Sequence, residues 1–264
     1  DGGFRGKKIT PLKEISDEAM DSTTSITKCI VLEHTKSNIT MKSERDVWWH
    51  KEMQEANSNF PAEIMDSEDP LFILYTSGST GKPKGIQHST AGYMIYTEFS
   101  FRNVFQYSEG DIYWCTADIG WITGHSYIIY GPLLAGATTM MFEGVPTYPD
   151  AGRFWKIVEE NKVNIFYTAP TAIRALEAKG MEFVNPYDLS SLKVLGTVGE
   201  PINEDAWHWY DKEIGKGNAP IVDTWWQTET GGILISNLAG VTPSKPTFAT
   251  LPLPGIQPCL VDEK

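Results

Sequence analysis

An eleven-residue segment, YTSGSTGKPKG, runs from Tyr75 to Gly85 and directly follows the apolar run LFIL at residues 71–74. It combines short hydroxyl side chains, glycines and two lysines. Glycines let backbone N–H groups turn toward an anion, hydroxyls donate hydrogen bonds, and lysines supply positive charge. We therefore predict a loop that follows a strand and binds the phosphates of a nucleoside triphosphate. The alternative is a flexible Gly/Ser linker, which the buried-strand pattern and the paired lysines disfavour.

The segment is not a Walker A loop. That pattern requires glycine where Thr76 stands and Ser or Thr where Pro83 stands. Pro83 also disfavours helical backbone at Lys82, so the chain is not expected to run straight into a phosphate-capping helix.

Composition narrows the class of protein. The 264 residues are 41% hydrophobic, which suffices for a substantial core, and the formal net charge is -12. This acidity argues against a nucleic-acid partner. Three cysteines without a CxxC motif and five histidines without HExxH predict neither a zinc site nor a disulfide framework, so we expect a reducing, cytoplasmic location.

Residues 120–142 contain no Asp, Glu, Lys or Arg, and a membrane-spanning helix must be considered at that length. Gly124, Gly131, Pro132 and Gly136 interrupt the stretch, which predicts a buried helix, a turn and a strand at residues 137–142 instead. The start of the chain has no signal-peptide pattern, and we expect no membrane partner. The chain opens in DGGFRGKK and stops at CLVDEK, so a fragment is expected.

Strand and helix patterns alternate along the chain. A helix is expected from Ser43, with Asp46 completing a capping box, and one after Asn203, where Trp207, Tyr210 and Ile214 repeat at helical spacing. The expected strands are residues 29–32, 71–74, 163–167, 192–195 and 220–222, and the expected helices are residues 43–57, 89–105, 170–179 and 203–214. This order predicts an α/β fold with mostly parallel sheets flanked by helices.

Ligands bind such sheets at the carboxyl ends of the strands. Four unusual polar clusters each follow an expected strand: the segment 75–85, YTAPTA after residue 166, TVGEP at 197–201, and DTWWQTETGG at 223–232. We expect them to form one site.

Residue types suggest roles within this site. The backbone of Gly199 and Pro201 could lie against a planar ring with Glu200 at its edge, and Asp223 could accept a hydrogen bond from an adenine amino group. Glu229 is a candidate ligand for a phosphate-bound Mg²⁺, which takes few protein carboxylates. The alternative for TVGEP is an ordinary β–α turn, that for Asp223 is a side chain that caps a loop, and that for Glu229 is a solvated surface carboxylate. Thr228 and Thr230 would add phosphate donors.

YTSGSTGKPKG, GEP and DTWWQTETGG, with YWCTADIGWITGH at 113–125, resemble the acyl-adenylate-forming superfamily over essentially the whole chain. Within this superfamily, the motifs together are most similar to the acetyl-coenzyme A synthetase family, and the paired tryptophans of WWQTETGG resemble those of the short-chain acyl-CoA synthetases. The resemblance implies that a carboxylate attacks the α-phosphorus of MgATP to give acyl-AMP and pyrophosphate, after which coenzyme A displaces AMP. Catalysis would then be orientation and charge neutralisation.

The resemblance also implies site residues. It places Thr76, Ser77, Gly78, Ser79, Thr80, Gly81, Lys82 and Lys84 at the phosphates. It places Gly199, Glu200, Pro201, Asp223, Thr224, Trp225 and Gln227 around the nucleotide, Thr228 at the α-phosphate and Glu229 at the magnesium. Lys84, Thr228 and Glu229 are the implied catalytic residues.

An acyl pocket is implied at Ile122, Thr123, Val198 and Trp226. A tryptophan that closes the pocket would limit the acid to two or three carbons, because each extra methylene meets overlap. The alternative for Trp226 is an ordinary core aromatic. Arg5, Lys8 and Ala169 match positions that contact coenzyme A, although the family often has arginine where Lys8 stands.

By resemblance, residues 1–264 are part of an AMP-binding adenylation domain that lacks the family's N-terminal portion and small C-terminal domain. We expect the isolated chain to be inactive or nearly so. The remaining alternatives are a propionyl- or other short-chain acyl-CoA synthetase and a non-catalytic nucleotide-binding module. The sequence does not indicate an oligomeric state.

Overall fold

The computed structural model describes residues 1–76 and 81–262, which form two compact units. The first unit contains residues Asp1–Ile64 and Glu143–Pro149, and the second contains Met65–Phe142 and Asp150–Lys264.

The first unit is small. Its elements are the antiparallel hairpin β1 (Gly3–Arg5) and β2 (Lys8–Thr10), helix α1 (Leu12–Asp21), the parallel pair β3 (Cys29–Val31) and β4 (Asp46–Trp48), and helix α2 (Trp49–Glu55). The expected strand at residues 29–32 is confirmed.

The prediction that a helix begins at Ser43 is wrong. Residues 46–48 form strand β4, and α2 begins only at Trp49. Asp46 does not cap a helix, because its buried carboxylate pairs with Lys13 Nζ at 2.8 Å and with Arg45 Nε at 2.6 Å. These charge-assisted bonds hold the pKa of Asp46 well below its usual range although burial alone would raise it. A tertiary ion pair therefore replaces the local capping motif.

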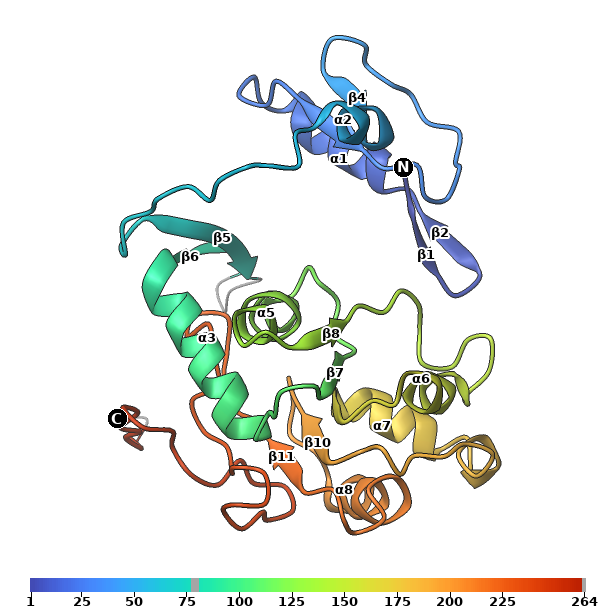
Figure 1. Cartoon of the computed structure of the whole chain (residues 1–264), viewed down its shortest axis with the longest axis vertical. Coiled ribbons are helices and arrows are strands. Elements are labelled where there is room, and N and C mark those ends of the chain that lie inside the picture. The colour runs from blue at the N-terminus through green and yellow to red at the C-terminus, as the bar shows by residue number, and fades with distance from the viewer. Residues whose placement is uncertain (77–80, 263–264) are drawn as a thin grey trace. The chain divides into compact units, whose positions relative to one another are not determined.

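The second unit is built around a five-stranded, wholly parallel sheet, seen at the centre of the unit in Figure 1. The strands are β7 (Ile112–Cys115), β8 (Thr138–Met140), β9 (Ile165–Thr168), β10 (Val194–Thr197) and β11 (Ile221–Asp223), in the order β11-β10-β9-β7-β8. The predicted α/β class, with parallel strands flanked by helices, is confirmed.

Helices cover both faces of this sheet. They are α3 (Thr90–Phe105), α4 (Ile122–Gly124), the π-helix η1 (His125–Tyr130), α5 (Gly131–Leu134), α6 (Arg153–Asn161), α7 (Pro170–Glu177), the 3₁₀-helix η2 (Met181–Phe183), α8 (Glu204–Trp209) and the π-helix η3 (Tyr210–Ile214). Asn203 precedes α8 as predicted, but its side chain makes no capping bond.

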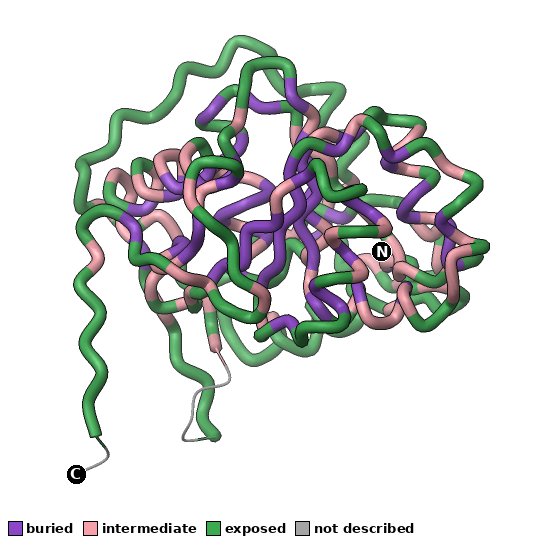
Figure 2. The backbone as a smooth tube through the Cα atoms, turned by 90° about the horizontal axis from the view of Figure 1, so that it is seen from below, coloured by how far each residue is buried: buried purple, intermediate pink, exposed green. Residues whose placement is uncertain are grey.

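Successive side chains of each strand point to opposite faces of the sheet and so pack against different helices. Trp114 and Phe166 pack with α6, α7 and α8 in one core, whereas Tyr113, Ile165 and Tyr167 pack with α3 and η1 in the other. Successive side chains of a strand point to opposite faces, so a sheet buried on both faces needs a continuous apolar run. The strands form the buried centre of Figure 2.

The hairpin that carries the segment 75–85 lies outside the five-stranded sheet. Strands β5 (Pro70–Thr76) and β6 (Lys84–Ser89) pair antiparallel with each other. The prediction that a strand at residues 71–74 precedes this loop is confirmed. The expectation that this strand belongs to the parallel sheet is wrong, because β5 pairs with β6 through a connection too short for parallel strands. The expectation that no helix follows Pro83 is confirmed.

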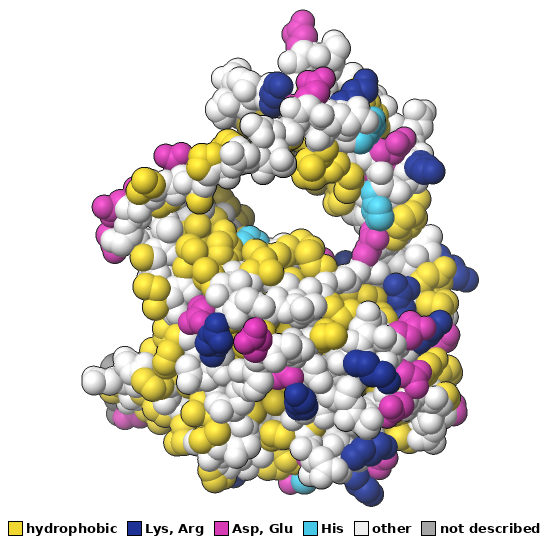
Figure 3. Space-filling model, in the orientation of Figure 1, with side chains coloured by type: hydrophobic (Ala, Val, Ile, Leu, Met, Phe, Trp, Pro, Cys, Tyr) yellow, Lys and Arg dark blue, Asp and Glu magenta, His cyan; other side chains and the backbone are white. Residues whose placement is uncertain are grey.

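Residues 120–142 form α4, η1, α5 and β8, as the interrupting glycines and proline predicted in outline. Within the described residues, no helix is both long and apolar enough to cross a membrane. On the face of the second unit seen in Figure 3, acidic and basic side chains are interspersed.

Candidate functional site

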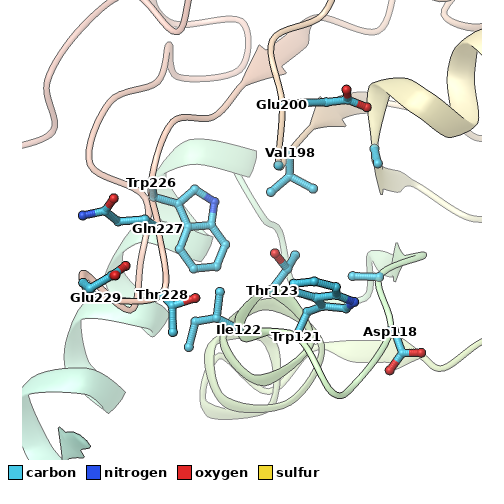
Figure 4. A pocket seen from close by; sticks show the side chains of 13 residues that line it. Asp118, Trp121, Ile122, Thr123, Val198, Glu200, Trp226, Gln227, Thr228 and Glu229 are labelled. Atoms are coloured by element: carbon cyan, nitrogen blue, oxygen red, sulfur yellow. The ribbon is translucent and has the colours of Figure 1, made fainter. Parts of the chain in front are cut away.

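A cavity of about 660 Å³ opens at the carboxyl end of the parallel sheet (Figure 4). The residues that line it are Ala117, Asp118, Trp121, Ile122, Thr123, Ala169, Val198, Gly199, Glu200, Trp226, Gln227, Thr228 and Glu229. They come from the segments that follow β7, β9, β10 and β11. Parallel strands end at one edge, which explains why segments far apart in the sequence meet here.

The three clusters YTAPTA, TVGEP and DTWWQTETGG are thus brought together as predicted. The phosphate contacts predicted for Ser77, Gly78, Ser79 and Thr80 lie outside the described residues. Gly81, Lys82 and Lys84 are exposed, and Thr76 pairs with Lys84 at the base of the hairpin. Among the described residues, none from this hairpin lines the cavity.

One wall of the cavity is apolar. Ile122 and Val198 are buried and Trp226 is half-buried, and the Trp226 indole projects between the loops that carry the other two (Figure 4). Its ring lies edge-to-face against Tyr127, with centroids 5.1 Å apart. Thr123 adds a hydroxyl beside the indole. The four residues of the implied acyl pocket therefore border one space.

The two neighbouring tryptophans have different environments. Trp225 is 55% exposed, and its backbone pairs with Ile235 as an isolated bridge. The cavity lining includes Trp226 but not Trp225. Side chains alternate along extended backbone, which explains why adjacent indoles separate in this way.

Glu200 uses its carboxylate to hold another element. Its Oε1 accepts a hydrogen bond from the Thr171 amide at 2.8 Å and another from the Thr171 hydroxyl, and its Oε2 accepts one from Arg174 Nη2 at 3.0 Å. The bond from the Thr171 hydroxyl is the main cause of a lowered Glu200 pKa, aided by Arg174. Figure 4 shows the carboxylate directed away from Trp226. Glu200 therefore joins the TVGEP loop to the first turn of α7.

We expect Glu200→Gln to weaken folding in a pH-dependent way. The pKa of Glu200 is lowered in the folded chain, so its stabilisation is present above the ordinary value of 4.5 and is lost as pH falls through the folded pKa. At pH 7 the variant should lose about 0.5–1 kcal/mol of unfolding free energy, a modest amount because the carboxylate is partly solvated. The difference from the parent chain should shrink below pH 4.5.

Chemical denaturation at several pH values measures this difference. The exposed Glu109, changed to Gln, is the matched control and should show little change at any pH. A deficit of Glu200→Gln that is the same at pH 3 and pH 7 would contradict the assigned role of the charge.

Two further predicted nucleotide contacts are buried beneath the cavity. Asp223 Oδ1 accepts a hydrogen bond from Thr197 Oγ1 at 2.7 Å, and burial raises the Asp223 pKa. Thr224 Oγ1 donates to the Thr197 carbonyl at 2.8 Å and accepts from the Tyr167 hydroxyl at 2.6 Å. Asp223 and Thr224 do not line the cavity. Pro201, which is exposed, does not line it either.

The loop after β11 presents its polar residues at the rim. Thr228 is half-buried, Gln227 and Glu229 are exposed, and all three line the cavity. Thr230 turns inward, where its hydroxyl bonds the Gln227 carbonyl at 2.9 Å. In the part of the chain that the structure describes, Glu229 has no ion pair or hydrogen bond through its carboxylate. It is therefore available to a cation that brings phosphate and water ligands of its own.

Comparison with known proteins identifies the family. The family described as AMP-binding enzyme matches residues 7–264. The chain belongs to the AMP-binding enzyme family.

Several curated relatives are called acetyl-coenzyme A synthetase. The chain is 58% identical to the protein of Desulfatibacillum aliphaticivorans over all 264 residues, which are 41% of that protein's length. It is 58% identical to the Syntrophobacter fumaroxidans protein over 99% of the chain and 40% of the relative. Acetyl-coenzyme A synthetase 2 of Pseudomonas aeruginosa is 55% identical over all of the chain and 41% of its own length. The chain thus spans about two fifths of the relatives it matches.

The residues implied for coenzyme A divide between the two units of this AMP-binding enzyme chain. Ala169 lines the cavity of the second unit, directly after β9. Arg5 and Lys8 are exposed and face each other across the β1–β2 hairpin of the first unit. Their assignment to one ligand remains a prediction.

Sequence reasoning missed several residues of the site. Ala117, Asp118 and Trp121 line the cavity but were not singled out. Strand β7 was not predicted, and its recognition would have marked the residues that follow it by the same rule as the other clusters. Arg174, in contrast, acts through Glu200 and carries no local signal.

Proposed function

We propose that the protein containing this chain activates acetate with ATP and transfers the acetyl group to coenzyme A, as an AMP-forming acetate–CoA ligase. One observation carries the proposal: the apolar residues Ile122, Val198 and Trp226 border the same cavity as the polar residues Thr228 and Glu229. A short apolar slot beside a phosphate-compatible rim fits a small carboxylic acid that meets a nucleotide. The names of the relatives agree with this chemistry.

The proposed reaction has two steps. A carboxylate oxygen of acetate attacks the α-phosphorus of ATP, and the bond to pyrophosphate breaks to leave acetyl-AMP. The thiolate of coenzyme A then attacks the acetyl carbonyl carbon, and AMP leaves. The second step conserves the activated acyl group as a thioester.

The chain would contribute orientation and charge complementarity. Trp226, Val198, Ile122 and Thr123 would hold the methyl end of acetate. Thr228 would donate a hydrogen bond to the α-phosphate. The backbone at Gly199, which has φ +93° and open space above its Cα, would face the adenine. Thr76, Gly81, Lys82 and Lys84 would grip the β- and γ-phosphates with Ser77, Gly78, Ser79 and Thr80.

Mg²⁺ would bind at Glu229. The exposed carboxylate at the cavity rim suits an ion that takes one protein ligand and keeps its phosphate oxygens and waters. When bound, the ion neutralises phosphate charge. Pro201, Asp223, Thr224, Trp225 and Gln227 would support or contact the nucleotide, and Arg5, Lys8 and Ala169 would contact coenzyme A.

Residues 1–264 would be part of an adenylation domain that acts in the cytoplasm on small-molecule substrates. Other regions of the complete gene product would hold the ribose and supply the adenylation lysine. We expect the 264-residue chain alone to have little or no turnover for that reason.

Acetate-dependent exchange of radiolabelled pyrophosphate into ATP tests the proposal. The complete gene product should catalyse it and should also form acetyl-CoA, whereas the 264-residue chain should do neither. A complete product that binds ATP without exchange for any short acid would favour a non-catalytic nucleotide-binding module. Faster exchange with propionate than with acetate would correct the substrate.

A further inference from the structure

We propose that His88 is a positioning residue that holds the Thr228–Glu229 loop in its working geometry. The inference rests on the proposed function, because Thr228 and Glu229 are its α-phosphate and magnesium residues. His88 belongs to strand β6 and does not line the cavity itself. Its contact with the loop spans 140 positions of sequence.

The contact is a partly buried hydrogen bond. His88 Nε2 lies 2.9 Å from the Thr228 carbonyl oxygen. A carbonyl only accepts, so Nε2 carries the proton and donates. His88 is 9% exposed, and burial lowers its pKa. The bond to Thr228 opposes this shift and the nearby His125 adds to it. Besides His125 on η1, the titratable group packed on the ring is the Tyr93 phenol of α3.

Aromatic neighbours fix the plane of the His88 ring. The ring centroid lies 5.2 Å from that of Phe72, its cross-strand partner on β5, and 4.9 Å from that of Tyr93. The Phe72 and Tyr93 rings also pack against each other, with centroids 5.0 Å apart, so the three rings form one cluster. A ring packed in such a cluster presents its N–H in one direction and loses little entropy when it forms the bond.

The loop is shaped to fit this ring. Gly231 has φ +70°, and a Cβ built there would lie 2.9 Å from His88 Cε1 and 2.8 Å from Tyr93 Cδ2. Glycine is therefore required both for the backbone conformation and for the close approach. The first glycine of TETGG, Gly231, allows the loop to pack directly against the His88 and Tyr93 rings.

A second bond holds the other end of the loop. Ser126 Oγ donates to the Gly231 carbonyl at 2.6 Å and accepts from the Tyr93 hydroxyl at 2.6 Å. His88 at Thr228 and Ser126 at Gly231 thus bracket Glu229 and Thr230. Strand β6 begins within the segment 75–85 and contains His88. The bond from His88 therefore connects the β5–β6 hairpin to the loop of Thr228 and Glu229.

Two substitutions separate the hydrogen bond from packing. His88→Leu removes the donor and keeps an apolar body, whereas His88→Gln keeps an amide N–H at similar reach. In the complete gene product, His88→Leu should lower kcat for acetate-dependent exchange by roughly 10- to 100-fold, as loss of a positioning contact does, with the acetate KM changed less than about twofold. His88→Gln should recover most of kcat.

Hydrogen exchange of the backbone amides at residues 228–231 provides a readout that does not depend on activity. His88→Leu should speed this exchange about tenfold, and His88→Gln should restore it. The exposed His208, changed to Leu, is the matched control and should leave both measurements unchanged. Wild-type rates in His88→Leu, or equal damage in His88→Leu and His88→Gln, would overturn the positioning role.

The two readouts keep the proposals distinct. A wild-type protein without acetate-dependent exchange would refute the proposed function, while the amide measurement would still decide whether His88 holds the loop. Faster amide exchange with unaltered kcat would show that His88 orders the loop without serving the reaction, which would also overturn the inference.

Discussion

Replacing Trp226 by glycine is expected to shift the acid preference of the complete gene product from acetate, its proposed substrate, to acids of about four to six carbons. The indole projects into the cavity between Ile122 and Val198, where it occupies the space that a longer acyl chain needs. Removing it allows each added methylene to be buried, worth about 0.8 kcal/mol or about fourfold in kcat/KM. Acetate, now loosely held, should lose at least about tenfold.

The measurement is kcat/KM for a series of straight-chain acids. Trp225→Gly is the matched control, because it deletes the adjacent, 55% exposed indole that does not line the cavity. That variant should keep the parent's chain-length profile. If Trp226→Gly also kept this profile while remaining folded and active, Trp226 would be a core aromatic and not the end of the acyl pocket.

Replacing Glu229 by glutamine is expected to lower kcat for acetate-dependent exchange by roughly 100- to 1,000-fold at a fixed Mg²⁺ concentration, the scale of losing one group that stabilises developing charge. The substitution preserves shape and removes the negative charge. Because the Glu229 side chain is exposed, the unfolding free energy should change by less than about 0.5 kcal/mol. Part of the lost rate should return as the Mg²⁺ concentration rises.

Titration of exchange activity against Mg²⁺ checks this prediction, with circular dichroism to confirm folding. Glu109→Gln, at another exposed acidic position, is the control and should retain parental activity and Mg²⁺ dependence. An unchanged Mg²⁺ dependence in Glu229→Gln would remove Glu229 from the metal site.

The parallel part of the fold could be predicted because its signals are local. The strands at residues 165–168, 194–197 and 221–223 are buried along their whole length and begin with apolar residues, as a sheet covered on both faces requires. Once they are recognised, the rule that ligands bind at strand carboxyl ends gathers YTAPTA, TVGEP and DTWWQTETGG into one site. The same rule failed for the segment 75–85, because β5 and β6 pair with each other.

The errors arose where a distant partner outweighs a local preference. Ser43 and Asp46 have the spacing of a capping box, yet Asp46 pairs with Lys13 and Arg45 and lies in a strand. A buried charge-assisted pair contributes more than a helix cap, and its partner at position 13 leaves no trace near residue 46.

Apolar patterns along the chain were enough to predict the α/β alternation, because they are local. The resemblance of its motifs to a known family indicated the AMP-binding class and most of the residues that line the cavity. Tertiary structure alone decided what those residues touch. The Glu200 carboxylate bonds to α7, and Trp226 lines the cavity whereas Trp225 does not. Asp223 and Thr224 are buried in hydrogen bonds to Thr197, and His88 bonds to Thr228. The hydrogen bonds among these contacts join residues that are 26 to 140 positions apart, so they depend on packing in three dimensions and local sequence patterns do not encode them.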